Sequence, residues 1–269
     1  MIKIKIAIKY IMDKLINNKR IVIVGPAPYL NKKKIGKLID SYDVTIRFNK
    51  GMNLMKHPSI YGSKTDILYH CVCQKQDNGG KITRSMYNYI KMLVFSYPKL
   101  HKTDKTSFNN GNSHLFKNFP KSNSKMRIIN KEYYIKMEKN IGCRPNTGII
   151  CILDLLQNFK PKEIYVTGFT FFKDGYSKLY RNKIDGKNVT EKKSTKIVLN
   201  RMINAGYKGR HNQWLIFKYF RNISNKYLNI LKFDDILLDM FKFDLSKYKI
   251  KHKLFKKTDE MIFCHYLLN

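Results

Sequence analysis

The chain has 269 residues, of which 53 are Lys or Arg and 19 are Asp or Glu, so its formal net charge is +34. Hydrophobic residues make up 43% of it, which is typical of a packed core and excludes a disordered polyelectrolyte. No apolar run approaches the ~20 residues that a bilayer-spanning helix needs. The five cysteines are odd in number and too few for a disulfide scaffold, so we expect a folded protein of the reducing cytoplasm.

The positive charge has two interpretations. Lys outnumbers Arg, and Ile and Asn are abundant, which is a bias that AT-rich coding produces by itself. A charge of this size also creates a field that favours anionic partners such as nucleotides, nucleic acid, acidic glycans or lipid head groups. The charge therefore leaves the identity of the partner open.

The first 19 residues predict a basic amphipathic segment that precedes a single domain over residues 20–269. Ile and Lys alternate before the run YIMDKLI. Lys9 and Asp13 break the apolar pattern and no small-residue cleavage site follows, so the segment is not typical of a signal peptide. We expect it to pack on the domain, with peripheral docking on an anionic membrane as the second interpretation.

Six short apolar runs predict buried strands, beginning with IVIVG, a β-branched run that ends at a glycine. The runs lie at Ile21–Gly25, Asp43–Asn49, Thr65–Val72, Met92–Tyr97, Glu163–Phe169 and in the first part of 229–241. Helical patterns alternate with them at Asn31–Ile39, Lys131–Lys139, Ile149–Phe159, 212–224 and the second part of 229–241. This alternation predicts an α/β fold with a mainly parallel sheet flanked by helices.

Two polar stretches interrupt this pattern. Residues 99–125 are rich in Asn, Ser and Lys and predict a long surface loop. Residues 173–207 are irregular and punctuated by glycines, and they predict a lid or acceptor-side loop.

Three turns of small residues flank the predicted strands and helices, at 25–28, 146–148 and 167–169. Ligands of parallel α/β sheets bind outside the carboxyl ends of the strands, so these turns indicate a nucleotide site. The first turn lacks both the G-x-G-x-x-G spacing and the Gly-Lys-Ser/Thr of a P-loop, so Gly25 alone predicts a tight turn.

Two asparagines, one at the end of a predicted strand and one at the start of a predicted helix, have more than one interpretation. Asn49 ends a predicted strand, where its amide can donate to a phosphate and accept from a hydroxyl, or simply form a turn. Asn146 or Thr147 can cap the following helix, whose N-terminal amides then form an anion site.

Two further groups are candidates for chemistry. His211 directly precedes a predicted helix and can accept a proton near neutral pH, although a lone surface histidine is the more common case. Asp234 and Asp235 suggest either the acidic pair of a metal-dependent glycosyltransferase or a helix cap, and the cap is the simpler interpretation.

These segments occur in the order of a known set of motifs. VGPAPYLNKKKIGKLIDSYDVTIRFN (24–49) resembles the large sialyl motif of the family 29 sialyltransferases, and YGSKTDILYH (61–70) also suits this family. RPNTGIICILDLLQNFKPKEIYVTGFTFF (144–172) resembles their small sialyl motif. GRHNQWLIFKYF (209–220) is similar to the very small motif, which carries the catalytic histidine.

The resemblance implies a variant Rossmann-like glycosyltransferase fold with one site for a CMP-sugar donor, either CMP-sialic acid or a related keto-acid sugar. It implies a donor loop at the first glycine turn, a phosphate or ribose contact from the strand-ending asparagine, and nucleotide contacts from the other two turns. In this sequence those residues are Gly25, Pro26, Ala27, Asn49, Asn146, Thr147, Gly148, Gly168 and Phe169, with Tyr176 and Tyr180 as further candidates for holding a phosphate or carboxylate.

By the same resemblance His211 is the general base of an inverting transfer to a glycan or glycolipid acceptor. An imidazole base contributes about 10²–10⁴ in rate. Amides at a helix terminus and cations can stabilise the departing phosphate, so the resemblance implies neither a cofactor nor a metal.

The sequence departs from the animal members of the family at several points. Pro26 stands where they usually have Asn, and Ile216 stands where they have an acidic residue. The cysteine pair that joins their large and small motifs is missing. These departures indicate a bacterial or viral-type member in a reducing compartment.

Two other hypotheses compete with this one. The charge of +34 suits a non-enzymatic polyanion-binding protein, whose binding would depend steeply on salt. The aromatic residues are not spaced like a nucleic-acid stacking platform, so we expect no specific nucleic-acid partner. The third hypothesis is a UDP-sugar transferase with a metal at Asp234 and Asp235, which a chelator would inhibit.

Overall fold

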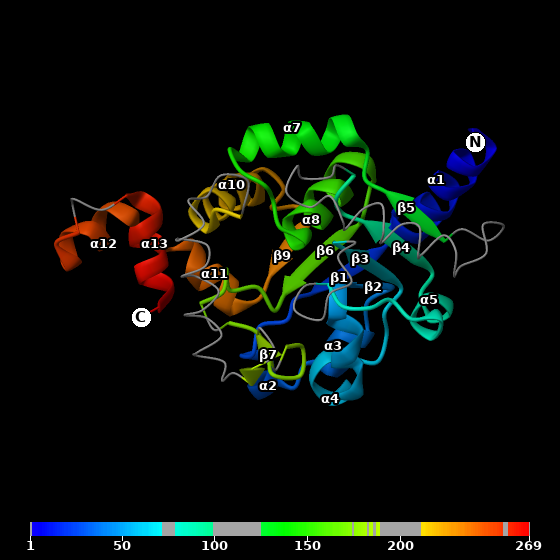
Figure 1. Cartoon of the computed structure of the whole chain (residues 1–269), viewed down its shortest axis with the longest axis horizontal. Coiled ribbons are helices and arrows are strands. Elements are labelled where there is room, and N and C mark those ends of the chain that lie inside the picture. The colour runs from blue at the N-terminus through cyan, green and yellow to red at the C-terminus, as the bar shows by residue number, and fades with distance from the viewer. Residues whose placement is uncertain are drawn as a thin grey trace.

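The structure is a computed structural model, and it describes residues 2–71, 79–98, 125–173, 175–181, 183–184, 187–188, 211–254 and 258–268. Within these ranges, seven parallel strands form one sheet in the order β5-β4-β3-β2-β1-β6-β9 (Figure 1). The strands are β1 (Arg20–Val24), β2 (Val44–Phe48), β3 (Ile67–His70), β4 (Met92–Phe95), β5 (Met126–Ile128), β6 (Glu163–Thr167) and β9 (Leu231–Phe233). β7 (Lys183–Ile184) and β8 (Lys187–Asn188) form a separate antiparallel pair. The predicted α/β fold with a parallel sheet is confirmed.

Helices cover both faces of the sheet (Figure 1). None of those described is long and apolar enough to cross a bilayer. They are α1 (Ile2–Ile16), α2 (Leu30–Lys33), α3 (Gly36–Asp40), the 3₁₀ helix η1 (Asn49–Lys56), α4 (Pro58–Tyr61), α5 (Arg84–Tyr89), α7 (Lys131–Ile141), α8 (Thr147–Asn158), α10 (Gln213–Lys226), α11 (Asp235–Phe241), α12 (Leu245–His252) and α13 (Asp259–Leu268).

The two-residue period of β1 explains how one strand packs against both layers. Ile21 and Ile23 join the core cluster that contains α8 and α10, whereas Val22 and Val24 join the cluster of α2, α3 and α4. All four side chains are at most 1% exposed. Burial of each such side chain contributes about 1.5–3 kcal/mol, so β1 stabilises the packing on both faces of the sheet.

The structure corrects several local predictions. The helix expected over 31–39 is two short helices, because Lys34 adopts a left-handed conformation with φ of 48° and ends α2. β5 was not predicted, since its three residues follow a polar stretch. The Lys-rich C-terminal region was not assigned any helix, yet it forms α12 and α13. Residues 99–124 and most of the predicted loop over 173–207 lie outside the described residues.

Candidate functional site

The connectivity of the sheet places a topological switch point between β1 and β6, and we call the region at the carboxyl ends of these two strands the crevice. β1 lies between β2, which follows it in the chain, and β6, which the chain reaches only after β5. The strand order therefore reverses at β1, and in open α/β sheets ligands bind at such a point, outside the carboxyl ends of the strands. Gly25 follows β1 directly and Gly168 follows β6 directly.

The two glycines press their backbones together in this crevice. The Gly25 amide donates to the Thr167 carbonyl over 2.8 Å, and the Ala27 amide donates to the Gly168 carbonyl over 3.1 Å. A Cβ on Gly25 would lie 2.2 Å from the Gly168 oxygen, and a Cβ on Gly168 would lie 2.4 Å from the Gly25 oxygen. Gly168 also has a φ of +77°, which side chains rarely adopt. Only glycine fits at either position.

The Phe169 ring connects this crevice to the start of α8. A Cβ on Gly148 would lie 2.6 Å from the ring, so the ring rests against the first turn of the helix. The ring also meets Phe48 at the end of β2, edge to face, with centroids 5.7 Å apart. Asn146 caps α8 by accepting a hydrogen bond from the Ile149 amide over 3.0 Å. The amide oxygen of Asn146 therefore acts as a helix cap, one of the two interpretations that the sequence offered.

Asn49 connects three segments at the neighbouring strand ends. Its side-chain oxygen accepts from the Cys71 amide, just after β3, over 2.8 Å. Its side chain also lies close enough to the Tyr180 hydroxyl to lower the pKa of that group, against the larger opposing effect of burial. With φ of 50°, Asn49 occupies the left-handed region that asparagine tolerates better than most residues. The turn interpretation of Asn49 is therefore correct for its backbone, and its contact with a donor stays a prediction.

The segment 175–181 packs over this group. The Ser177 amide donates to the Pro26 carbonyl over 2.8 Å, which ties the segment to the first glycine turn. The rings of Tyr176 and Tyr180 lie 5.3 Å apart, and the Arg181 guanidinium sits 4.6 Å above the Tyr176 ring. Burial raises the pKa of both tyrosines, so their hydroxyls are neutral at physiological pH. The structure thus brings Tyr176 and Tyr180 to the same strand ends as Asn49.

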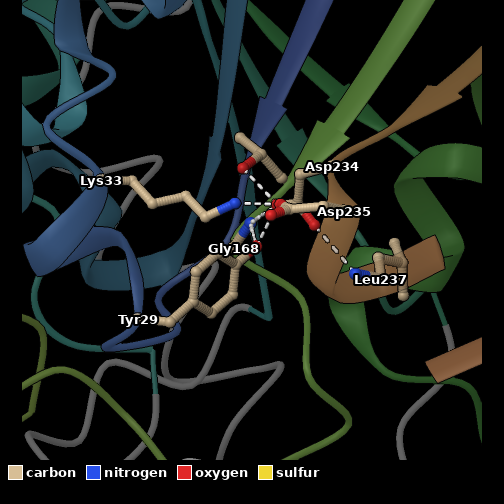
Figure 2. A network of polar contacts seen from close by, with 7 residues as sticks. Tyr29, Lys33, Gly168, Asp234, Asp235 and Leu237 are labelled. Carbon is tan, nitrogen blue, oxygen red and sulfur yellow. Dashed lines mark hydrogen bonds and ion pairs between the residues drawn. The ribbon is translucent and has the colours of Figure 1, made fainter. Parts of the chain in front are cut away.

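Asp234 ties the carboxyl ends of β1, β6 and β9 together (Figure 2). It is 5% exposed, and one carboxylate oxygen accepts from the hydroxyls of Tyr29 and Thr167, the latter over 2.6 Å. The other oxygen caps α11 by accepting from the Leu237 amide over 2.9 Å. The Tyr29 hydroxyl in turn accepts from the Gly168 amide over 2.7 Å.

Asp235 turns away from this network. Its carboxylate is 73% exposed and pairs with Lys33 (Figure 2). The cap interpretation of Asp234 is confirmed, and the two neighbouring carboxylates have separate partners. The hypothesis of a metal bound jointly by the pair has no support from this geometry.

His211 lies at the N-terminal side of α8. Its Nδ1 is 2.9 Å from the Arg144 carbonyl oxygen, two residues before the cap of that helix. A carbonyl only accepts, so the neutral ring carries its proton on Nδ1 and its lone pair on Nε2. The next residue, Asn212, caps α10 through the Leu215 amide and donates to Glu260 of α13 over 2.5 Å. The backbone around His211 is therefore fixed from two helices.

Sequence reasoning missed Tyr29 and Asp234 as partners. They are 205 residues apart, and no local pattern in the sequence links the two. The one available signal was that Tyr29 directly follows the turn Gly25–Pro28. Gly209 and Arg210, which precede the histidine in the quoted motif, lie outside the described residues.

Comparisons with known proteins agree with the motifs. Residues 10–197 match the family model "Glycosyltransferase family 29 (sialyltransferase)". No curated protein sequence matches the chain significantly.

Solved structures of sialyltransferases are similar to the chain at low sequence identity. A mammalian sialyltransferase is 16% identical, with 81% of this chain and 69% of that chain covered and a TM-score of 0.48. Another structure of a mammalian sialyltransferase, in complex with Gal-beta-1-3GalNAc-ortho-nitrophenol, is 18% identical, with 74% and 72% covered and a TM-score of 0.41. The sialyltransferase CstII from Campylobacter jejuni, in complex with the substrate analogue CMP-3FNeuAc, is 15% identical, with 83% and 84% covered and a TM-score of 0.46.

Proposed function

Because the chain belongs to glycosyltransferase family 29, the sialyltransferase family, we propose that it transfers sialic acid or a related keto-acid sugar from a CMP-sugar to a glycan acceptor. The observation that carries the proposal is the contact between His211 and the Arg144 carbonyl, over 2.9 Å. It brings a proton-accepting ring to the N-terminal end of α8, where helix amides favour a phosphate.

In this proposal His211 is the general base. Its Nε2 takes the proton of the acceptor hydroxyl while that oxygen forms a bond to the anomeric carbon of the sugar. The bond from this carbon to the CMP phosphate breaks on the opposite face, and its electron pair leaves with CMP. The configuration therefore inverts, and a base positioned in this way contributes about 10²–10⁴ in rate.

The departing CMP gains negative charge on its phosphate. The first amides of α8, from Thr147 and Gly148, are not needed by the helix itself and can donate to that phosphate. We assign the loop Gly25–Ala27, Gly168 and Phe169 to the nucleotide. We also assign a contact with the donor to the Asn49 side chain, whose oxygen accepts from the Cys71 amide.

The acceptor side is proposed from charge alone. A net charge of +34 suits a glycan or glycolipid at an anionic surface, which also fits peripheral contact with a membrane from the cytoplasm. Co-sedimentation with phosphatidylserine vesicles, compared with phosphatidylcholine vesicles, tests this part independently of the chemistry.

Thermal unfolding in the presence of nucleotides tests the proposed donor class. CMP at 100 times its dissociation constant should stabilise the protein by about 2.7 kcal/mol, whereas UDP and AMP should not. A chelator should leave the CMP effect unchanged, because the phosphate is held by amides and cations. Stabilisation by UDP that depends on a divalent metal would overturn the CMP proposal, and so would the absence of any CMP effect.

A further inference from the structure

The carboxylate of Asp234 is an acceptor for four donors. Three are the hydroxyls of Tyr29 and Thr167 and the amide of Leu237, and the fourth is the Gly168 amide at a longer 3.4 Å. A carboxylate accepts at both oxygens and donates at neither, so the four donors match it fully. Hydrogen bonds to a buried charged group are also among the stronger ones.

Tyr29 links the Asp234 carboxylate to the two glycine turns through hydrogen bonds. Its hydroxyl accepts from the Gly168 amide over 2.7 Å and donates to Asp234 (Figure 2). Burial and the neighbouring carboxylate raise the pKa of Tyr29, so the hydroxyl keeps the proton that it donates. The carbonyl of the same residue, Gly168, accepts from the Ala27 amide. Gly168 is thus held from both sides by the segment that begins at Gly25.

The orientation of the two glycine turns in the crevice depends on these hydrogen bonds of Gly168. The turns at Gly25 and Gly168 meet through their backbones and two backbone hydrogen bonds, and the Phe169 ring lies 2.8 Å from where a Cβ on Gly25 would be. The polar chain from Gly168 through Tyr29 to Asp234 adds hydrogen bonds at the Gly168 amide, a group that the backbone hydrogen bonds between the two turns do not use. A rotation of the Gly168 peptide would break the chain and also move Phe169, which rests against α8.

We propose that Asp234 and Tyr29 are positioning residues for the nucleotide: they hold the Gly168 turn in the orientation that receives it. This inference rests on the proposed function, because it concerns the same nucleotide site. Neither side chain needs to touch the ligand. Their effect is on the affinity for CMP and for the donor, through the Gly168 turn.

Conservative variants of the whole chain test the proposal. Tyr29→Phe removes the hydroxyl and leaves the ring in place. Asp234→Asn introduces an NH₂ among four donors. The matched control is Lys33→Met, which removes the ion pair with Asp235 (Figure 2) and the contact of the Lys33 ammonium with the face of the Tyr29 ring, but keeps the Tyr29 hydroxyl and Asp234.

Two readouts separate positioning from loss of stability. The first is the dissociation constant of CMP, measured by titration well below the unfolding temperature of each variant. The second needs no ligand: it is the rate of hydrogen exchange at the Gly168 amide.

We expect Tyr29→Phe to weaken CMP binding about ten-fold, the usual effect of one lost hydrogen bond to a charged network, and to accelerate exchange at Gly168. In steady state the KM for the donor should rise more than kcat falls. Lys33→Met should change neither readout.

Unchanged exchange at Gly168 in Tyr29→Phe, or unchanged CMP affinity despite faster exchange, would overturn the inference. A variant that is merely less stable would show a lower unfolding temperature with wild-type CMP affinity, and that result also counts against it. If the wild-type protein does not bind CMP, the proposed function fails, whereas hydrogen exchange still decides whether Tyr29 holds the turn.

Discussion

The crevice between β1 and β6 and the aromatic layer on α10–α13 are held together in opposite ways. In the crevice, Gly25 and Gly168 meet by their backbones, and a polar chain fixes their orientation. In the aromatic layer, large rings pack on one another; its members are Trp214, Phe217, Phe241, Phe243 and Phe263. The stacked pair Phe217 and Phe263 has centroids 4.8 Å apart.

This difference predicts that the crevice determines ligand binding and that the aromatic layer determines stability. Backbone contacts bury little apolar surface, so the crevice contributes geometry and few kilocalories. The aromatic layer buries large side chains and contributes stability without any group that can do chemistry. Substitutions in the crevice should therefore change ligand binding, whereas substitutions in the layer should change the free energy of unfolding and leave ligand binding unchanged.

A substitution of His211 is expected to have the largest effect on activity, and it tests the division because His211 lies where the crevice and the aromatic layer meet. It contacts Arg144, two residues before the α8 cap, and its neighbour Asn212 caps α10 of the aromatic layer. We expect His211→Ala to lower the transfer rate by about 10²–10⁴ and to leave CMP affinity and the unfolding temperature close to those of the wild type.

The matched control is His57→Ala, since His57 is exposed on the opposite layer of the fold. It should retain full activity in the same transfer assay. Transfer by His211→Ala at a rate near that of the wild type would remove His211 from the mechanism.

Phe263→Ala should have the largest effect on stability. The ring is fully buried and contacts Trp214, Phe217 and Phe243. Truncation of such a ring costs about 3–5 kcal/mol, measured by denaturant unfolding. CMP affinity of the folded variant should be unchanged. Leu238→Ala on α11 is the control, and it should cost little because Leu238 is 48% exposed.

A change in CMP affinity in Phe263→Ala would break the division between the two regions. It would mean that the aromatic layer also sets the geometry of the crevice.

The sequence predicts the sheet far better than it predicts the polar network. Strands β1 to β4 are mainly apolar runs in which nearly every residue is buried, and that pattern is local and strong. β5 was missed because MRI is too short to show a pattern. The break at Lys34 was missed because a left-handed lysine has no signature in the sequence.

Part of the site was predictable and part was not. Glycines and asparagine at strand ends mark Gly25, Gly168 and Asn49, and a cap motif marks Asn146. The partnership of Tyr29 with Asp234 has no local signal, because it depends on how β9 comes to lie beside β6. Long-range side-chain pairing follows from topology, and a single sequence does not encode it in any short pattern.

Gly25→Ala tests whether the close approach of Gly25 and Gly168 is needed for CMP binding. The added methyl group would lie 2.2 Å from the Gly168 carbonyl, which cannot yield as a flexible side chain can. We expect a loss of stability at the upper end of about 1–3 kcal/mol, together with at least a ten-fold loss of CMP affinity. Chemical denaturation and CMP titration measure the two effects.

Gly142→Ala is the control for this glycine. Its Cβ would approach Leu215 at an ordinary 3.5 Å, and its φ of +82° costs only backbone strain. It should lower stability slightly and leave CMP affinity unchanged. Equal CMP affinity in Gly25→Ala and Gly142→Ala would show that the close approach of the two turns has no functional role.

A substitution of His70 is expected to have the smallest effect on stability, and it tests whether a buried residue at the strand ends also affects CMP binding. It lies at the same sheet edge as Asn49, yet it is fully buried and bonded to the Gly80 carbonyl over 3.1 Å, so its role is structural. Burial lowers its pKa to about 4, against a usual 6.5.

Between these two pH values the unfolded chain binds more protons at this histidine than the folded protein does. The stability that the neutral ring provides is therefore complete above pH 6.5 and is lost as the pH falls toward 4. In His70→Gln the amide can still donate to Gly80 and does not titrate. Between pH 7 and pH 5 the wild type should lose about 2 kcal/mol more unfolding free energy than the variant, while both bind CMP equally at pH 7. Weaker CMP binding by His70→Gln would show that the buried end of β3 also takes part in holding the nucleotide. The residues that set ligand binding would then extend from the crevice to β3.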